Sequence, residues 1–176
     1  MSDSTEYNWY KQVNGKDPLE QGDIILDCPI ITPPDKITVG KHLPAKSTAY
    51  DVIIMSQSCD LAARKIRIVQ VCPIYCLEEL SNLDAKYRNV GIRNNLRKGK
   101  IITMHMLHKC ENSKFNDFLI VDFGSTFGVN INFLFEYSQK QKDRIRLLPP
   151  YREHLSQSFA RFFMRVGLPS NIPEFT

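Results

Sequence analysis

"YDVIIMSQSCDLAARKIRIVQVCPIY", residues 50–75, predicts two neighbouring strands of a buried sheet. The apolar run 52–55 is continuous, as in a strand that is covered on both faces. A second run begins at Ile66 and Ile68 and shows a weaker alternation of apolar and polar residues. Between the runs, "SQSCD" places an amide, a thiol and a carboxylate where the first strand ends. This strand end therefore either carries a functional site or holds a turn together.

Further apolar runs on both sides of this stretch are typical of strands. They cover residues 19–31, 100–107 and 117–131, and the last is interrupted by Gly124 and Gly128. Short strands of this kind, followed by a helix at the C-terminus, predict an α+β domain. We expect a small β-barrel or a strongly curved antiparallel sheet with a C-terminal α-helix.

Two segments have helical patterning. Residues 76–99 begin with Leu77, Leu80 and Leu83 on one face and then become polar and rich in turn formers. Pro149 and Pro150 precede a second helix, and Gly167 is suited to its C-terminal cap. Five apolar side chains share one side of this helix: Leu155, Phe159, Phe162, Phe163 and Val166. We expect a polar lead-in over 1–18, a single globular domain over 19–169 and a tail over 170–176.

The composition is that of an ordinary globular protein, with 43% hydrophobic and 24% charged residues among 176. It excludes a disordered or fibrous chain. No apolar run approaches the roughly 18–20 residues of a membrane span, and the N-terminus lacks the pattern of a signal peptide. We therefore expect a cytoplasmic protein without membrane contact. In that compartment the five cysteines are expected to be free thiols or ligands.

Basic residues are concentrated in one part of the chain, although the net charge is only +4. No acidic residue occurs between Asp84 and Glu111, whereas seven basic residues do: Lys86, Arg88, Arg93, Arg97, Lys98, Lys100 and Lys109. A segment of one sign attracts polyanions and releases their counterions on binding. The alternative is a solvated basic loop that is balanced in space by acidic residues elsewhere.

The order of these elements resembles the PemK/MazF-type toxin domain over about residues 20–166. Gly22 and Asp23 match the family's opening strand, Ser56 the end of its second strand, and Pro73 the Ala-Pro position of the next. The "RIRLL" segment matches an Arg-Leu pair before the final helix. The resemblance implies an SH3-like barrel, and it implies a metal-independent endoribonuclease of a bacterial toxin–antitoxin or phage-defence system. It also implies a homodimer.

The site residues that the resemblance implies match only in part. Ser125 or Thr126 corresponds to the family's catalytic Ser or Thr, whereas Tyr50 and Asp51 stand where the family has its catalytic arginine. Cleavage would then need a basic residue from elsewhere in the chain. The segments "SQSCDL" and "PYREHL" also resemble those of small uncharacterised bacterial proteins, which brings no known activity.

A second candidate catalytic set lies around the quoted stretch. Cys59 could act as a nucleophile if a base such as His105 lay within hydrogen-bond reach and Asp60 oriented the ring. The alternative is a structural thiol. Gln57 and Asp60 could form the polar floor of a pocket, or they could bond the backbone of the turn.

Several histidine and cysteine residues are also candidates for a zinc site. Cys72, Cys76, His105, His108 and Cys110 are suitable ligand types. On a strand, however, His105 and His108 would point to opposite faces, and the chain has no tight Cys-x-x-Cys pair. We therefore expect no metal or cofactor, with zinc as the alternative.

Two functional hypotheses follow. The first is binding of nucleic acid, single-stranded RNA rather than DNA, with phosphate contacts from the basic segment: Arg88, Arg93, Arg97, Lys98 and Lys100. The second is a non-catalytic interaction module whose helix 152–166 binds a partner protein.

Overall fold

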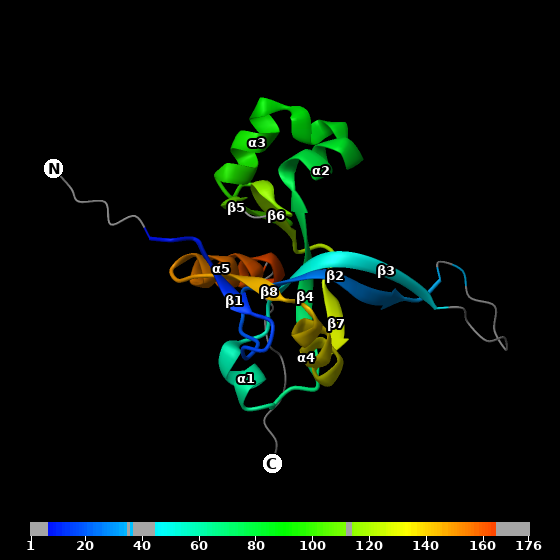
Figure 1. The fold of residues 1–176 in the computed structure, drawn as a ribbon. Coiled ribbons are helices and arrows are strands. Elements are labelled where there is room, and N and C mark those ends of the chain that lie inside the picture. Colours follow the sequence, from blue (N-terminus) through cyan, green and yellow to red (C-terminus); the bar gives the residue numbers. More distant parts are fainter. Residues whose placement is uncertain (1–6, 35, 37–44, 112–113, 165–176) are drawn as a thin grey trace, which may run out of the picture.

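The computed structural model describes residues 7–34, 36, 45–111 and 114–164. Within these residues, eight strands form one antiparallel sheet in the order β1-β8-β2-β3-β4-β6-β5, and β7 also pairs with β4 (Figure 1). The strands are β1 Tyr10–Asn14, β2 Asp23–Thr32, β3 Lys46–Ile54, β4 Ile68–Cys76, β5 Met104–Glu111, β6 Asn116–Asp122, β7 Phe127–Asn130 and β8 Asp143–Leu147.

Helices join and cover the strands. They are α1 Ser58–Ala62, α2 Leu77–Leu83, the 3-10 turn η1 Ala85–Arg88, α3 Val90–Arg97, α4 Ile131–Lys140 and α5 Tyr151–Phe163. Figure 1 shows α2 and α3 beside β5 and β6 at one end of the molecule, with α1 and α4 at the opposite end. We call residues 77–118 the upper lobe.

The predicted α+β class with a C-terminal helix is confirmed. The sheet is open rather than a closed barrel, because β1 and β5 are not paired with each other. The strands predicted on both sides of "SQSCD" are β3 and β4, which pair antiparallel through Val52 and Pro73. Residues 10–14, which we expected in a polar lead-in, instead pair with β8.

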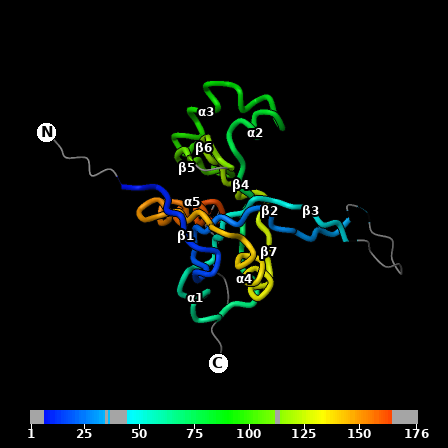
Figure 2. Tube along the Cα trace, in the orientation of Figure 1, coloured from blue at the N-terminus to red at the C-terminus, as the bar shows by residue number. Residues whose placement is uncertain are grey.

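β4 connects the two ends of the molecule (Figure 2). Its first residues pair with β7, its middle with β3 and its last with β6. The apolar run of β4 is therefore enclosed from several sides, and Val71 and Cys72 are fully buried. β4 ends at Cys76, where α2 begins the upper lobe.

Three helices were not predicted from the sequence, and side chains cap two of them. Asn89 accepts hydrogen bonds from the backbone N–H groups of Gly91 and Ile92, which begins α3 in the polar part of 76–99. Asn130 begins α4 in the same way. The third helix, α1, is only one turn long and has no side-chain cap.

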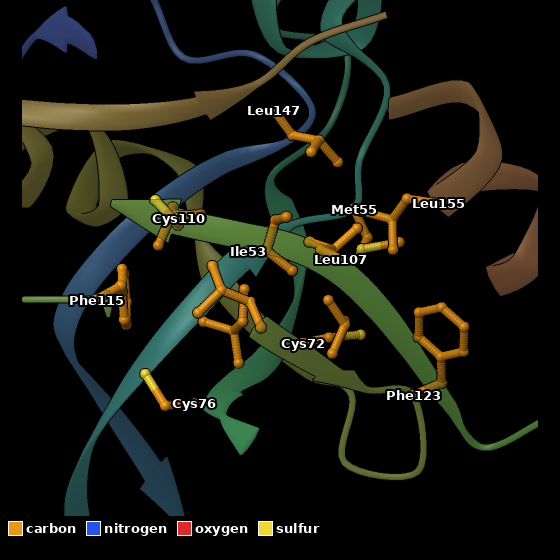
Figure 3. Close-up of a cluster of buried hydrophobic side chains, with 14 residues drawn as sticks. Ile53, Met55, Cys72, Cys76, Leu107, Cys110, Phe115, Phe123, Leu147 and Leu155 are labelled. Carbon is orange, nitrogen blue, oxygen red and sulfur yellow. The ribbon is translucent and has the colours of Figure 1, made fainter. Parts of the chain in front are cut away.

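The largest core cluster lies where β2, β3, β4, β5 and α5 meet. Ile53, Leu107 and Leu155 come from three of these elements into one group of buried side chains (Figure 3). The expected apolar faces extend less far than predicted. Leu83 on α2 is 73% exposed and Phe163 on α5 is 63% exposed, so neither belongs to the core.

A buried ionic cluster joins β2 to β8. The Asp23 carboxylate is fully buried and accepts hydrogen bonds from Arg146 Nη2 at 2.9 Å and Arg144 Nη2 at 3.3 Å, as well as from Arg146 Nε. Arg146 also pairs with Glu20. Gly22 precedes Asp23 with φ of 85°, and an added Cβ would lie 3.1 Å from Leu147 Cβ. The positive φ and this close approach explain the glycine at position 22.

Several predicted features fall outside the described residues. They are a short strand at 37–39, the helix end at Val166 with its cap at Gly167, and the tail at 170–176. None of the helices in the described part of the chain has the length and apolar character needed to cross a bilayer.

We predict that Asp23→Asn lowers the free energy of unfolding by about 3–5 kcal/mol, because it leaves two buried guanidinium groups without their carboxylate. Urea denaturation measures this change. Glu136→Gln, on the exposed face of α4, is the control and should change stability by less than about 0.5 kcal/mol. A loss below about 1 kcal/mol for Asp23→Asn would contradict this role.

Candidate nucleic-acid interface

The "SQSCD" segment forms hydrogen bonds that hold the ends of β2, β3 and β4 together. Ser56 Oγ accepts a hydrogen bond from the Gln70 backbone N–H at 2.9 Å, and Ser58 Oγ accepts one from the Gln21 N–H at 3.0 Å. The buried Gln21 amide donates to the Met55 carbonyl at 2.7 Å. The serines of the quoted stretch therefore hold the turn together.

The candidate catalytic residues of this segment face outward. Cys59 is exposed on α1, and its thiol lies 3.9 Å from Asp60 Oδ1. The exposed Gln57 amide lies 3.5 Å from Ser156 Oγ on α5. Among the described residues, no hydrogen bond connects His105 to this segment.

His105 occupies a partly buried position on β5. Its ring stacks on Phe123, with ring centroids 6.1 Å apart. Burial, with a smaller contribution from the charge of His154, lowers the pKa of His105 to about 4. The imidazole is therefore neutral at pH 7 and belongs to the packing between β5 and α5.

Ser125 and Thr126 lie in the loop that separates β6 from β7. The Thr126 hydroxyl donates to the Phe123 carbonyl at 3.1 Å and lies 3.6 Å from Cys72 Sγ, so it stabilises this loop. Asp51, where the resemblance implies an arginine, forms an ion pair with Lys114 at 2.8 Å. No described ion pair or hydrogen bond brings a basic side chain to Ser125 or Thr126.

The buried cysteines carry protonated thiols at neutral pH. Burial raises the pKa of Cys72 and Cys110 to about 11 and that of Cys76 to about 12, where Glu79 and Asp117 add to the effect. Among the residues whose structure is described, no three His, Cys, Asp or Glu side chains gather closely enough to hold a metal ion. His108 is instead stacked on Trp9 at 5.5 Å.

The basic segment folds around a groove of about 730 Å³ in the upper lobe. α2, η1, α3, β5 and β6 all contribute to its walls. Four basic and two acidic residues line the groove: Arg88, Arg93, Arg97, Lys109, Glu78 and Asp117. We call it the basic groove.

Two of its arginines are held by neutral acceptors. Arg88 Nε donates to the Ser81 carbonyl at 3.1 Å, and Arg93 Nε donates to the Tyr87 carbonyl at 2.7 Å. Arg93 Nη2 also lies 3.3 Å from Ser81 Oγ. These bonds fix the guanidinium planes without neutralising their charge. Of the ion pairs among the described residues, none includes a basic side chain of the groove.

The carboxylate of Asp117 is already engaged by the backbone. Its Oδ2 accepts from the Glu78 N–H at 2.9 Å, and its Oδ1 accepts from the Phe118 N–H at 2.7 Å. The negative charge thus stabilises the N-terminus of α2. Lys109, paired across the strands with Phe118, places its ammonium 5.7 Å from the centre of that ring.

The other predicted surfaces lie elsewhere. Lys98 and Lys100 follow α3 and are exposed, but they do not line the basic groove. On α5, Leu155 is buried and Phe159 packs against the same core, so much of the apolar face expected for a partner is covered within the chain.

Sequence reasoning missed Phe118 and did not include Lys109 among the binding residues. Their pairing depends on a bulge in β5 between Leu107 and Lys109, which shifts the register with β6. No local sequence pattern predicts this bulge. The acid-free segment was the available signal, and three of its arginines, Arg88, Arg93 and Arg97, line the same groove.

No family model matches this chain, and a search of curated proteins likewise finds no match.

We predict different effects for neighbouring residues of the quoted stretch. Ser58→Ala should lower the free energy of unfolding by about 1–2 kcal/mol, because the buried Gln21 N–H loses its acceptor. Cys59→Ser, at an exposed position, should change it by less than about 0.5 kcal/mol. Chemical denaturation of both variants measures the difference, and equal effects would contradict the role of Ser58.

We predict that acid weakens the fold through His105. Folding lowers its pKa from 6.5 to about 4, so between these values the unfolded chain binds a proton that the folded chain does not. This contribution is fully present above pH 6.5 and falls as the pH drops, by about 2 kcal/mol between pH 7 and pH 5. Urea unfolding at both pH values should show a smaller difference for His105→Gln. An unchanged difference would refute the assignment.

Proposed function

We propose that the protein binds single-stranded RNA in the basic groove. The observation that carries the proposal is the way Arg88 and Arg93 are held. Each guanidinium is oriented by neutral groups, and no carboxylate of the described residues forms an ion pair with it, in a groove shared with Arg97 and Lys109. Such groups are arranged for an anionic ligand, since Arg can present a planar pair of donors to phosphate.

Phe118 supports a single-stranded rather than a double-stranded ligand. Its ring is partly exposed among the cations of the groove, where it offers a stacking surface for a base. Bases of a duplex are stacked on one another and cannot use such a surface, whereas unpaired bases can.

Side-chain amides favour RNA over DNA. Asn82, Asn94 and Asn116 line the same groove. An amide can both donate to and accept from a 2′-hydroxyl, and this group distinguishes RNA from DNA. The proposal concerns binding, because the described contacts bring no basic side chain to Ser125 or Thr126.

We predict that a labelled twelve-residue oligo(U) binds with a steep salt dependence. Four phosphate contacts give a logarithmic slope near −3, or about a 50-fold loss of affinity between 50 and 200 mM salt. The double variant Arg97→Ala and Lys109→Ala loses two phosphate contacts, so the slope should become less negative by about 1.4. Fluorescence anisotropy measures both quantities, and the matching DNA oligomer should bind more weakly.

The matched control is the pair Lys98→Ala and Lys100→Ala, which removes the same charge from the same segment outside the groove. This control should keep most of the affinity. Phe118→Leu should weaken binding about 5- to 100-fold without changing the slope, because stacking releases no counterions. Equal losses for the two double variants would show general attraction to a basic surface and contradict a groove.

A further inference from the structure

A large cavity lies between β1 and β5, the two edge strands of the sheet. It has a volume of about 1230 Å³. Residues 9–12 of the β1 region line it, and so do residues 108–111 of β5. β1 and β5 are the two edge strands of the open sheet, so the cavity lies where the sheet is not closed into a barrel.

The two edges are held near each other without pairing. Tyr10 Oη donates to the His108 carbonyl at 2.8 Å, and the Trp9 ring stacks on the His108 ring at 5.5 Å. Trp9 also stacks on Tyr151 of α5 at 3.4 Å. Side chains therefore bridge the gap at one point, where strand-to-strand hydrogen bonds are missing.

The hydrogen bonds at the ends of β1 show which of its backbone groups are free. The Leu148 N–H donates to the Trp9 carbonyl at 2.8 Å, and the Gly15 N–H donates to the Lys142 carbonyl at 3.0 Å. Bonded and non-bonded positions alternate along an antiparallel pair. The odd-numbered residues of β1 therefore face β8, and the even-numbered ones turn their N–H and C=O groups to the free edge.

Tyr10 and Gln12 are the even-numbered residues that line the cavity. Asn14 continues the series, and its N–H indeed points out of the sheet, to Asp17 Oδ2 at 3.0 Å. The edge of β1 thus presents two N–H and two C=O groups, spaced as in a strand, to the cavity.

The lining of the cavity combines an apolar floor with a charged rim. Ile24, Leu26 and Ile145 contribute apolar side chains from β2 and β8. Charges of both signs line the cavity, from Lys11, Lys109, Lys142, Arg144, Asp27, Glu111 and Asp143. The charge of Arg144 is paired with Asp23, so the other six balance. A polyanion is thus not favoured here, in contrast to the basic groove.

We propose that this gap accepts an extended peptide of a partner protein, which pairs with the free edge of β1 as an additional strand on the side that faces β5. The backbone donors and acceptors along the β1 edge are matched by a polypeptide strand, which carries such groups at every second residue. The apolar floor selects apolar side chains at every second position, and the rim selects polar ones between them. The lining stretches of four residues correspond to a segment of about four to six residues.

The test uses a phage-displayed library of eight-residue peptides, selected on the full chain. Selected peptides are then synthesised and their affinities measured for the wild type and two variants. Gln12→Pro removes one edge N–H at a position where proline does not interrupt the pairing with β8. It should weaken binding about 10-fold or more, whereas Gln12→Ala should weaken it less than about 2-fold.

A second measurement does not depend on the folding of any variant. Each peptide is prepared with N-methyl groups on its odd-numbered or its even-numbered residues. Because only one set of N–H groups faces β1, one methylated form should bind the wild type at least about 10-fold more weakly than the other. Two methylated forms that bind with the same affinity as each other would overturn the proposal. Equal affinity of the peptides for Gln12→Pro and wild type would overturn it too, as would a library that yields no binder.

Discussion

The carboxylate of Asp23, buried between two arginines of β8, is the constraint on which the rest of the structure depends. A buried charge is tolerated only with partners that satisfy it, so β2 and β8 must meet at this point. Arg144 also donates to the Asp17 carbonyl at 2.8 Å and Arg146 to the Pro18 carbonyl at 2.7 Å. The loop between β1 and β2 is thereby fixed, and with it the edge strand β1.

The protein uses arginine in two physically different ways. Arg144 and Arg146 surround a carboxylate and are buried, so their charges are neutralised within the fold. Arg88 and Arg93 bond backbone carbonyls at the border of a groove, and their charges stay available to a ligand. In our proposal, a carboxylate partner marks a structural arginine, whereas an arginine held by neutral acceptors alone binds the ligand.

The sequence predicted the parts of the fold that follow from local pattern. The continuous apolar run before "SQSCD" indicated a covered strand, and the prolines before α5 indicated its start. Contacts between residues that are distant in the sequence could not be predicted from local pattern. Nothing near Asp23 shows that Arg146, which lies 123 positions away, satisfies its charge. The bulge that brings Lys109 opposite Phe118 has no local signature either, so the candidate site was predicted as a basic segment and not as a groove.

The most direct test of the account observes the tethered arginines themselves. The Nε–H groups of Arg88 and Arg93 are engaged by backbone carbonyls, so their signals should be visible in nitrogen-detected NMR spectra of the free protein. On addition of oligo(U), we expect both signals and that of Arg97 to shift together in a saturable manner. Signals that stay unmoved while the RNA binds elsewhere would contradict the central claim that these guanidinium groups are held for an anionic ligand.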